Sequence, residues 1–142
     1  MSSPVQESRD TRGVVTLTIN RPDRRNALDM AIIDGMQAGF ARVAEDPSVR
    51  AVIIAGSGPV FCAGVYFDWL RRAQDQDDAA NRADTDRLAA LYRAIDSCTR
   101  PVVAQVQGGA WAGGCSMIAA CDVVVAGESA RFAITEARIG LT

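Results

Sequence analysis

The residues with the clearest potential for chemistry lie in a glycine-rich stretch at 102–122, which reads VVAQVQGGAWAGGCSMIAACD. An apolar run, Val102 to Val106, predicts a buried strand, and a glycine-rich turn joins it to an apolar helix. The first N–H groups of a helix have no acceptor within it, so this turn suits a phosphate or the oxyanion of a reacting carbonyl. A tight turn that uses glycine only for packing fits the same pattern.

A second turn of similar character, VFCAGVYF at 60–67, follows another apolar strand predicted over Arg50 to Ala55. The small residues Ala63 and Gly64 would let a ligand approach the backbone closely. Taken alone, this stretch is as well explained by a packed turn. Ligands of open parallel sheets bind at the carboxyl ends of the strands, so two such turns could direct amide donors at one oxygen.

Glu136 is the only acid in the largely apolar run 132–140. A carboxylate in such surroundings can take a proton and return it during a reaction. An ion pair with Arg131 or Arg138 is the structural alternative. Glu136 is therefore a candidate acid or base whose partner the sequence leaves open.

The composition limits which side chains could act in catalysis, because the chain contains no histidine and no lysine. Ser-His-Asp and Cys-His catalysis are excluded, and proton transfer falls to Asp, Glu, Tyr, Cys or water. The four cysteines form no C-x-x-C pair, which favours small buried thiols over a metal site. Neither glycine-rich turn completes a known phosphate-binding motif.

Three arginines after the first strand could contact phosphates or form a solvated surface: Arg21, Arg24 and Arg25.

The elements that must position these residues alternate between strands and helices. Strands are predicted at 14–19, 50–55, 102–106 and 122–126, and helices at 29–46, 67–72, about 88–95 and 113–120. Asp29 is a plausible N-cap, and the polar stretch 74–87 is expected to be a solvated or mobile segment leading into a helix. This order predicts an α/β fold with a largely parallel sheet and right-handed crossovers.

The length and charge of the chain limit its number of domains and its possible partners. The chain has 142 residues, 49% of them hydrophobic and 23% charged, with a net charge of −2. These values indicate one globular domain and argue against a nucleic-acid partner. No apolar run is long enough to span a membrane, and the polar N-terminus lacks the pattern of a signal peptide. A cytoplasmic location is therefore expected.

Six motifs in order resemble the crotonase superfamily, the enoyl-CoA hydratase/isomerase family: LTINRPDRRNALD, DPSVRAVIIAG, FCAG, QGGAWAGGC, AACDVVVA and ARFAITEARIGL. The resemblance implies crotonase-like ββα repeats with a mostly parallel sheet. It assigns residues 1–12 to an N-terminal tail and residues 13–142 to the N-terminal part of the family domain. The family continues past the last motif, so the resemblance also implies that the C-terminal helical part is missing.

The resemblance implies acyl-CoA thioester chemistry through an enolate. The backbone N–H groups of Val65 and Gly113 would form the oxyanion hole. Glu136 matches the second catalytic glutamate of the family, and Ser116 stands where the first would be. Coenzyme A would be part of the substrate, with no separate cofactor and no metal, and the assembly would be a homotrimer or hexamer. The residues expected to border the coenzyme A moiety are Ala63, Gly64, Tyr66, Phe67 and, for its phosphates, Arg24 or Arg25.

Two departures from the family pattern matter. Tyr66 occupies a position where the family commonly has Asp. Ser116 cannot act as a carboxylate acid or base, although it could hold a water. The favoured interpretation is hydration of a 2-enoyl-CoA by a single glutamate. A 3,2-enoyl-CoA isomerase and a non-catalytic acyl-CoA or acyl-carrier binding remnant are alternatives, and a nucleotide-binding domain is a weaker one because no phosphate motif completes.

Overall fold

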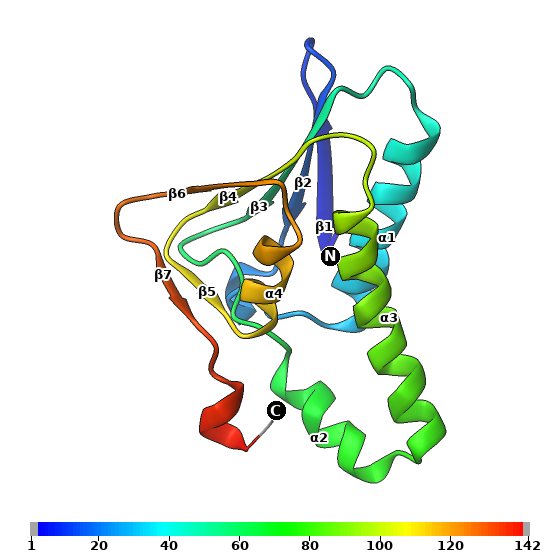
Figure 1. Cartoon of the computed structure of the whole chain (residues 1–142). Coiled ribbons are helices and arrows are strands. Elements are labelled where there is room, and N and C mark those ends of the chain that lie inside the picture. Colours follow the sequence, from blue (N-terminus) through cyan, green and yellow to red (C-terminus); the bar gives the residue numbers. More distant parts are fainter. Residues whose placement is uncertain (1–2, 141–142) are drawn as a thin grey trace.

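The computed structural model describes residues 3–140, which form a mixed α/β fold around a five-stranded sheet of order β1-β2-β3-β4-β6 (Figure 1). β1 pairs with β2 in antiparallel fashion, and every other neighbouring pair in this sheet is parallel. The largely parallel α/β sheet predicted from the sequence is confirmed. The strands are β1 (Val5–Arg9), β2 (Val14–Ile19), β3 (Ala51–Gly56), β4 (Val102–Val106) and β6 (Val123–Ala126).

A second, two-stranded sheet pairs β5 (Gly109–Trp111) with β7 (Arg131–Ala133) in parallel. The sequence predicts neither strand. Each has only three residues, which is too short for an alternating pattern to stand out. β5 lies inside the stretch expected to be a continuous glycine-rich turn, so the path from β4 to the following helix includes a strand.

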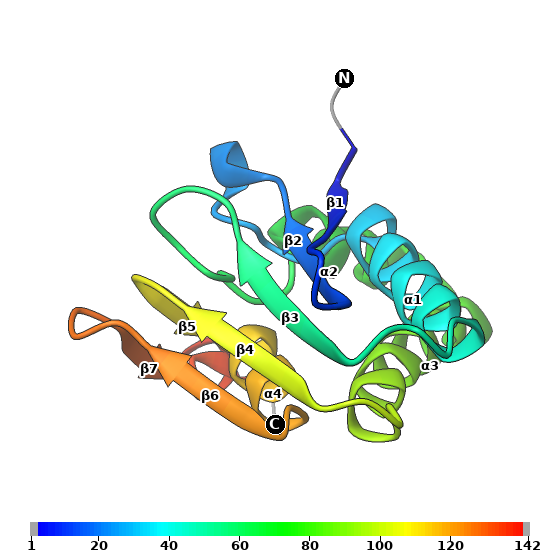
Figure 2. The same cartoon turned by 90° about the horizontal axis from the view of Figure 1, so that it is seen from above.

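Two long helices, α1 (Met30–Glu45) and α3 (Asp78–Asp96), lie alongside each other against the larger sheet (Figure 2). α1 comes very close to β2, since a Cβ added at Gly39 would lie 2.8 Å from the Leu17 side chain. Alternate residues of β2 are buried, as the pattern of a strand with one covered face requires. The remaining helices are α2 (Phe67–Asp75), α4 (Gly113–Ala119) and the 3₁₀ turns η1 (Pro22–Arg24) and η2 (Glu136–Ile139).

The helix boundaries follow the capping residues. Asp29 accepts a hydrogen bond from the Ile32 amide and is the N-cap of α1, as predicted. Residues 74–87 are largely exposed, as expected of a solvated segment, but most of them are helical, because α2 extends to Asp75 and α3 begins at Asp78. Asp77 caps α3 by accepting from the Ala80 amide at 2.8 Å. The stretch is polar because the first part of α3 is largely exposed.

The N-terminal segment also differs from its prediction. Residues 1–12 are expected to be a tail, yet within the described residues Val5–Arg9 form the edge strand β1 of the larger sheet. The segment has the polar composition of a tail because β1 has neighbours on one side only and four of its five residues are exposed. Val5 is the exception, and a Cβ added at Gly35 of α1 would lie 2.9 Å from its side chain.

The opposite edge of the sheet is apolar and exposed. Val123, Val124 and Val125 of β6 are 50%, 44% and 57% exposed, and Phe132 of β7 is 48% exposed. Contiguous exposed apolar side chains of this kind are uncommon on monomeric soluble proteins and mark interaction surfaces. This edge contrasts with β1, whose exposed side chains are polar.

One buried polar side chain, Asn26, joins the turn after β2 to the loop after β3. Its amide nitrogen donates to the carbonyls of Ser57 and Val60 at 2.8 and 2.7 Å, and its Oδ1 accepts from the Arg21 amide at 2.8 Å. Asn26 is fully buried and has φ +56°, a left-handed conformation that Asn tolerates better than most residues. It therefore stabilises both loops at once.

We expect Asn26→Ala to lower the free energy of unfolding by about 3 kcal/mol, because it empties a fully buried site and leaves three partly buried backbone groups without this partner. Urea denaturation followed by circular dichroism measures this loss. Asn20→Ala, which deletes an exposed side chain bonded to the Ser3 carbonyl, is the control and should change stability by under about 1 kcal/mol. Equal losses in the two variants would contradict the role given to Asn26.

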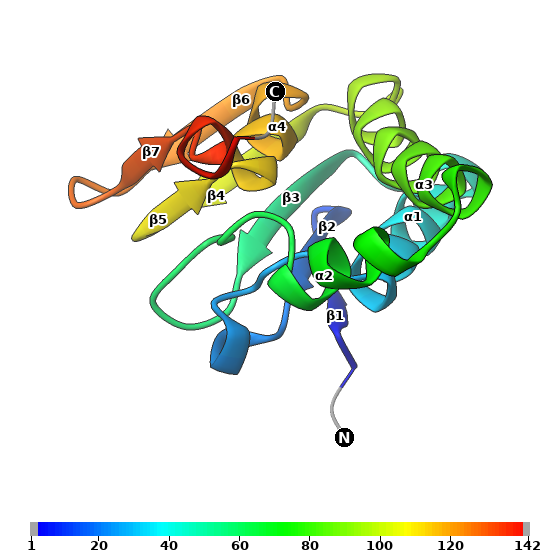
Figure 3. The same ribbon diagram turned by 90° about the horizontal axis from the view of Figure 1, so that it is seen from below.

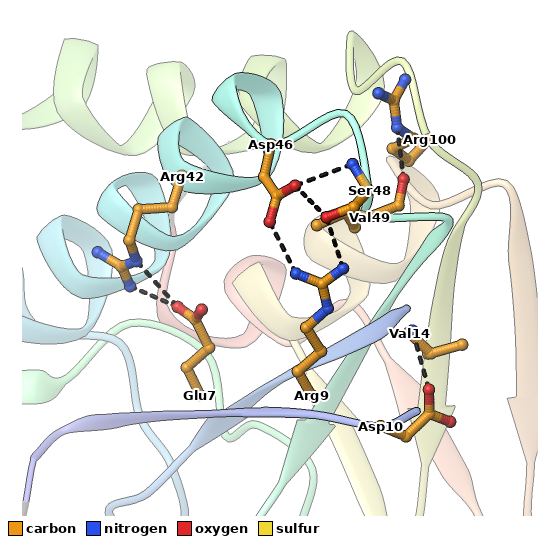
Figure 4. A network of polar contacts seen from close by, with 9 residues as sticks. All are labelled: Glu7, Arg9, Asp10, Val14, Arg42, Asp46, Ser48, Val49 and Arg100. Carbon is orange, nitrogen blue, oxygen red and sulfur yellow. Dashed lines mark hydrogen bonds and ion pairs between the residues drawn. The ribbon is translucent and has the colours of Figure 1, made fainter. Parts of the chain in front are cut away.

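A polar network ties β1 to the segment after α1 (Figure 4). Arg9 donates to Asp46 at 2.7 Å and to the Ser48 hydroxyl at 2.8 Å, and Arg42 of α1 pairs with Glu7 at 2.6 Å. Asp46 also accepts from the Ser48 hydroxyl and amide. These Ser48 hydrogen bonds, followed by the Arg9 interaction, lower the pKa of Asp46 below its ordinary value of 3.8.

A carboxyl whose folded pKa is depressed stabilises the protein above its unfolded pKa, and this contribution is lost as the pH falls through the folded pKa. We therefore expect Asp46→Asn to lower the thermal midpoint at pH 7, and its difference from the wild type to shrink once the pH falls below about 4 and to vanish below the folded pKa of Asp46. Thermal denaturation from pH 7 to pH 2.5 measures this. Asp86→Asn, at an exposed site without an ion pair inside residues 3–140, should run parallel to the wild type. A constant gap for Asp46→Asn would contradict the assignment.

Candidate active site

The two glycine-rich turns pair with each other through the backbone. Cys62 bridges Ala110 of β5, with the Cys62 amide donating to Gly109 at 3.1 Å and the Trp111 amide donating to Cys62 at 2.9 Å. Val65 forms a similar bridge to Leu28, just before α1. These bridges hold the loop after β3 between two other segments of the chain.

The hydrogen bonds of the first turn leave one amide free. Ala63 donates to the Arg25 carbonyl at 3.0 Å, and Tyr66 donates to the Leu28 carbonyl at 2.9 Å. The Gly64 amide lies by the Cys62 sulfur and partly offsets the burial that raises the pKa of this thiol. Within residues 3–140, the Val65 amide has no protein acceptor.

The second turn also leaves free amides at the start of α4. The Ala112 amide donates to the Ala133 carbonyl at 2.9 Å, and Cys115 and Ser116 donate to the Ala112 carbonyl. The amides of Gly113 and Gly114 have no acceptor in the described part of the chain, as expected at a helix N-terminus. Ala112 has φ +51° and ψ −120°, a strained conformation for a residue with a side chain. Strain of this kind clusters at functional sites.

The free amides of Val65 and Gly113 belong to neighbouring residues in space. Gly64 has φ +87°, and a Cβ added there would lie 3.5 Å from the Gly113 nitrogen and 2.8 Å from the Ala112 Cβ. A Cβ added at Gly113 would lie 3.6 Å from a methyl group of Val65. The structure thus brings together the two donors that the sequence assigns to an oxyanion hole. Only glycine at position 64 permits this approach.

A cavity of about 540 Å³ opens beside these turns. Its volume falls in the range of small-molecule sites, which are apolar with a few polar groups. Figure 3 views the contributing segments from below. The lining residues come from the first turn and α2 (Ala63, Val65, Phe67, Leu70), from the second turn (Trp111, Ala112), and from Arg25, Ala133, Thr135, Glu136 and Arg138.

Glu136 brings a carboxylate to this cavity from the first residue of η2. Its Oε2 is buried and has no hydrogen-bond partner. The described residues show no ion pair between Glu136 and Arg131 or Arg138, so the structural alternative raised by the sequence is not observed. A buried carboxylate oxygen without a partner is costly and calls for an explanation such as a ligand that supplies a proton.

Five predicted site residues do not line the cavity: Gly64, Tyr66, Arg24, Gly113 and Ser116. Gly64 and Gly113 border it through their neighbours. Ser116, one turn into α4, is exposed. Of the two arginines proposed for phosphate binding, Arg25 lines the cavity, whereas Arg24 lies 4.7 Å above the centre of the Tyr66 ring. Tyr66 precedes α2 and, unlike the Asp common at this position, gives that helix no side-chain cap.

Tyr92 is a polar neighbour of the site that sequence reasoning missed. Its hydroxyl donates to the Gly113 carbonyl at 3.1 Å. Burial, followed by the nearby Cys62, raises the pKa of Tyr92 well above its usual range. In the sequence Tyr92 shares the helical spacing of Leu91 and Ile95, which marks it only as part of an apolar face.

Other candidate chemistry is not supported by the described residues. The four cysteines are free, and burial raises the pKa of Cys62 and Cys121 to about 12, so these thiols are protonated at neutral pH. Within residues 3–140, no cluster of three His, Cys, Asp or Glu side chains could hold a metal. No helix in that range has the length and apolar character needed to cross a bilayer.

Comparison with known proteins identifies the family. A family model described as enoyl-CoA hydratase/isomerase matches residues 9–142. The chain belongs to the enoyl-CoA hydratase/isomerase family. The crotonase resemblance inferred from the six motifs is thereby confirmed, including the motifs that contain the two free amides and Glu136.

Relatives within the enoyl-CoA hydratase/isomerase family differ in activity. The 2,3-dehydroadipyl-CoA hydratase of Escherichia coli is 37% identical over 128 residues, which are 90% of this chain and 48% of the relative. The human mitochondrial Delta(3,5)-Delta(2,4)-dienoyl-CoA isomerase is 33% identical over 138 residues, which are 90% of this chain and 42% of the isomerase. A solved enoyl-CoA hydratase from Mycobacterium smegmatis, at 40% identity, has a TM-score of 0.93 and covers 99% of this chain and 54% of that chain. The chain therefore spans about half the length of these relatives.

We expect Gly64→Ala to lower the free energy of unfolding by about 3 kcal/mol, because it forces a left-handed residue and a Cβ clash with Ala112. Chemical denaturation measures this loss. The matched control is Gly127→Ala, whose added Cβ would meet only the Val106 carbonyl at an ordinary 3.8 Å. The control should stay within about 1 kcal/mol of the wild type. If the Gly64→Ala protein were as stable as this control, the two turns could move apart without lowering the free energy of unfolding.

Proposed function

We propose that the chain carries the acyl-CoA site of an enoyl-CoA hydratase that adds water to a 2-enoyl-CoA with Glu136 as its single carboxylate. The observation that supports this most is the convergence of two free amides, from Val65 and Gly113, beside a cavity that contains an unpartnered carboxylate. The hydratase names of the Escherichia coli and Mycobacterium smegmatis relatives support the same reaction class.

In the proposed reaction, the thioester oxygen accepts hydrogen bonds from the Val65 and Gly113 amides. These donors stabilise the negative charge that develops on that oxygen as an enolate forms, a contribution of about 10²–10³ in rate for one donor. Glu136 takes a proton from water while the water oxygen bonds to the β-carbon. The α-carbon then receives a proton from Glu136 or from a water held by Ser116. The net change is addition of H and OH across the double bond.

The proposed substrate contacts follow from the same geometry. The backbone from Ala63 to Phe67 would border the coenzyme A moiety, including Gly64 and Tyr66. Arg25 lines the cavity and is the better placed of the two arginines to meet a phosphate, since Arg24 is engaged with the Tyr66 ring. Coenzyme A enters as part of the substrate. A homotrimeric or hexameric assembly and a cytoplasmic location stay predictions from the sequence.

A second candidate is movement of a double bond from carbon 3 to carbon 2 of an enoyl-CoA. One carboxylate is enough for this reaction, because Glu136 can take a proton from carbon 2 and return it at carbon 4. The isomerase among the relatives supports this second reaction as a candidate. A site that binds acyl-CoA without turnover is the non-catalytic alternative.

We expect Glu136→Gln to lower the rate of 2-enoyl-CoA hydration by about 100-fold or more, because the amide cannot accept the proton of the attacking water. The loss of absorbance of the conjugated thioester measures hydration. The thermal midpoint should not fall, since Gln keeps the size of Glu and the buried Oε2 of Glu136 has no hydrogen bond to lose.

Glu128→Gln, an exposed glutamate between β6 and β7, is the matched control and should keep full activity. Turnover of a 3-enoyl-CoA without hydration of a 2-enoyl-CoA would replace the proposed reaction by isomerisation. Coenzyme A binding by calorimetry without turnover of either substrate would support the non-catalytic alternative. Full hydration by Glu136→Gln would exclude the role given to Glu136.

A further inference from the structure

We propose that Trp111 is a specificity-determining residue of this site, whose indole is the wall that limits the length of the acyl group. This inference rests on the proposed acyl-CoA site and narrows its substrate class to thioesters of short acyl chains. Trp111 lines the cavity and takes no part in the proposed proton transfer.

The backbone segments around the cavity lie in a row, which gives the cavity two ends. The Ala63 amide donates to the Arg25 carbonyl at 3.0 Å, so the loop after β3 lies next to the segment that contains Arg25. The Trp111 amide donates to the same loop at 2.9 Å, which makes β5 the third segment. β7 is the fourth, because Trp111 pairs with Ala133 (Figure 3). Arg25 therefore lies at one end of the row, and Glu136, which follows β7, lies at the other.

This order sets which part of an acyl-CoA would meet Trp111. A phosphate of coenzyme A would be attracted to Arg25 at the first end. The thioester oxygen would bind the free amides of Val65 and Gly113 in the middle of the row. The carbons beyond the thioester then extend toward Glu136. Trp111 belongs to the segment on the Glu136 side of the loop after β3, so it borders these acyl carbons.

The Trp111 indole is packed against its own strand. A Cβ added at Gly109 would lie 2.4, 2.4 and 2.5 Å from three indole atoms, and Gly109 is buried. Residues two apart in a strand project from the same face, so the indole folds back along β5 and covers the backbone of Gly109. Glycine at position 109 leaves the room for this. With one ring face against the backbone, the indole forms a firm boundary of the cavity.

A boundary of this kind selects the acyl group by length. In an apolar pocket each further methylene group adds affinity only where it finds room to be buried. A chain that reaches a fixed ring must turn into solvent or displace the ring, and displacement forces strain on well-packed neighbours. Long acyl chains therefore gain little over short ones while the indole is in place.

The test is calorimetric binding of butanoyl-CoA and octanoyl-CoA, which lack the double bond needed for hydration and so are not turned over. Trp111→Ala should shift the ratio of the two Kd values about 10-fold in favour of octanoyl-CoA, because about two more methylene groups find room. Trp111→Leu, which keeps an apolar side chain, should shift the ratio in the same direction by a smaller factor.

The matched control is Phe132→Ala, which removes another aromatic side chain of the two-stranded sheet. Phe132 is 48% exposed and does not line the cavity. Successive side chains of a strand point to opposite faces, so Phe132 faces away from its cavity-lining neighbour Ala133. This variant should leave the ratio of the two Kd values unchanged.

A second measurement tests the placement of the indole without any ligand. Gly109→Ala should lower the thermal midpoint by about 5 °C or more, because the added methyl group meets the ring. In a Trp111→Ala background the same substitution should lower the midpoint far less, since the ring is gone. Equal losses in the two backgrounds would overturn the placement of the indole on Gly109.

The outcomes separate this inference from the proposed function. If both acyl-CoAs bind and Trp111→Ala leaves the ratio of their Kd values unchanged, the length limit is overturned and the acyl-CoA site stands. If the ratio shifts as expected but no 2-enoyl-CoA is hydrated, the wall is supported and the proposed reaction is overturned. A wild-type protein that binds neither acyl-CoA would overturn the proposed site and this inference with it.

Discussion

The arrangement of the site depends on one close contact between backbones. The loop after β3 and the segment between β4 and α4 are far apart in the sequence, and the bridge between Cys62 and Ala110 draws them together. At Gly64 the approach is so close that a Cβ would lie 2.8 Å from that of Ala112. The amides of Ala63, Tyr66 and Ala112 donate to neighbouring segments of the chain, whereas those of Val65 and Gly113 have no acceptor within residues 3–140. The same close approach therefore brings two residues with free amides next to each other.

Neighbouring segments stabilise this contact even though one of its residues, Ala112, is strained. Ala112 adopts a backbone conformation that disfavours any side chain, and its amide is anchored to Ala133 of β7. On the other side, Asn26 joins the turn after β2 to the loop that leads to Gly64. These contacts fix the positions of the two turns that contain the free amides of Val65 and Gly113. Donors fixed in advance need no reorganisation as charge develops, which is why hydrogen bonds of this kind can contribute strongly to catalysis.

Sequence reasoning identified the parts of the site that depend on local patterns. The strands over 14–19 and 102–106, the cap at Asp29 and the alternation of elements all follow from periodicity and capping chemistry. Two features could not be predicted from periodicity or capping chemistry. β5 and β7 are too short to show a pattern, and they exist because they pair with each other. Tyr92 lies at a helical position that is typical of core residues. Only the structure shows that its hydroxyl donates a hydrogen bond to the Gly113 carbonyl.

The remaining question is what the loss of a second carboxylate at position 116 means for the chemistry. One oxyanion donor is worth about 10²–10³ in rate, and a general base about 10²–10⁴. Both of these contributions have candidates in the structure, in the Val65 and Gly113 amides and in Glu136. Serine at position 116 offers a hydroxyl and no carboxylate, so in the proposed reaction it could hold a water but could not carry the proton. The two free amides do not depend on the side chain at 116, so the proposed stabilisation of a thioester oxygen is independent of this residue.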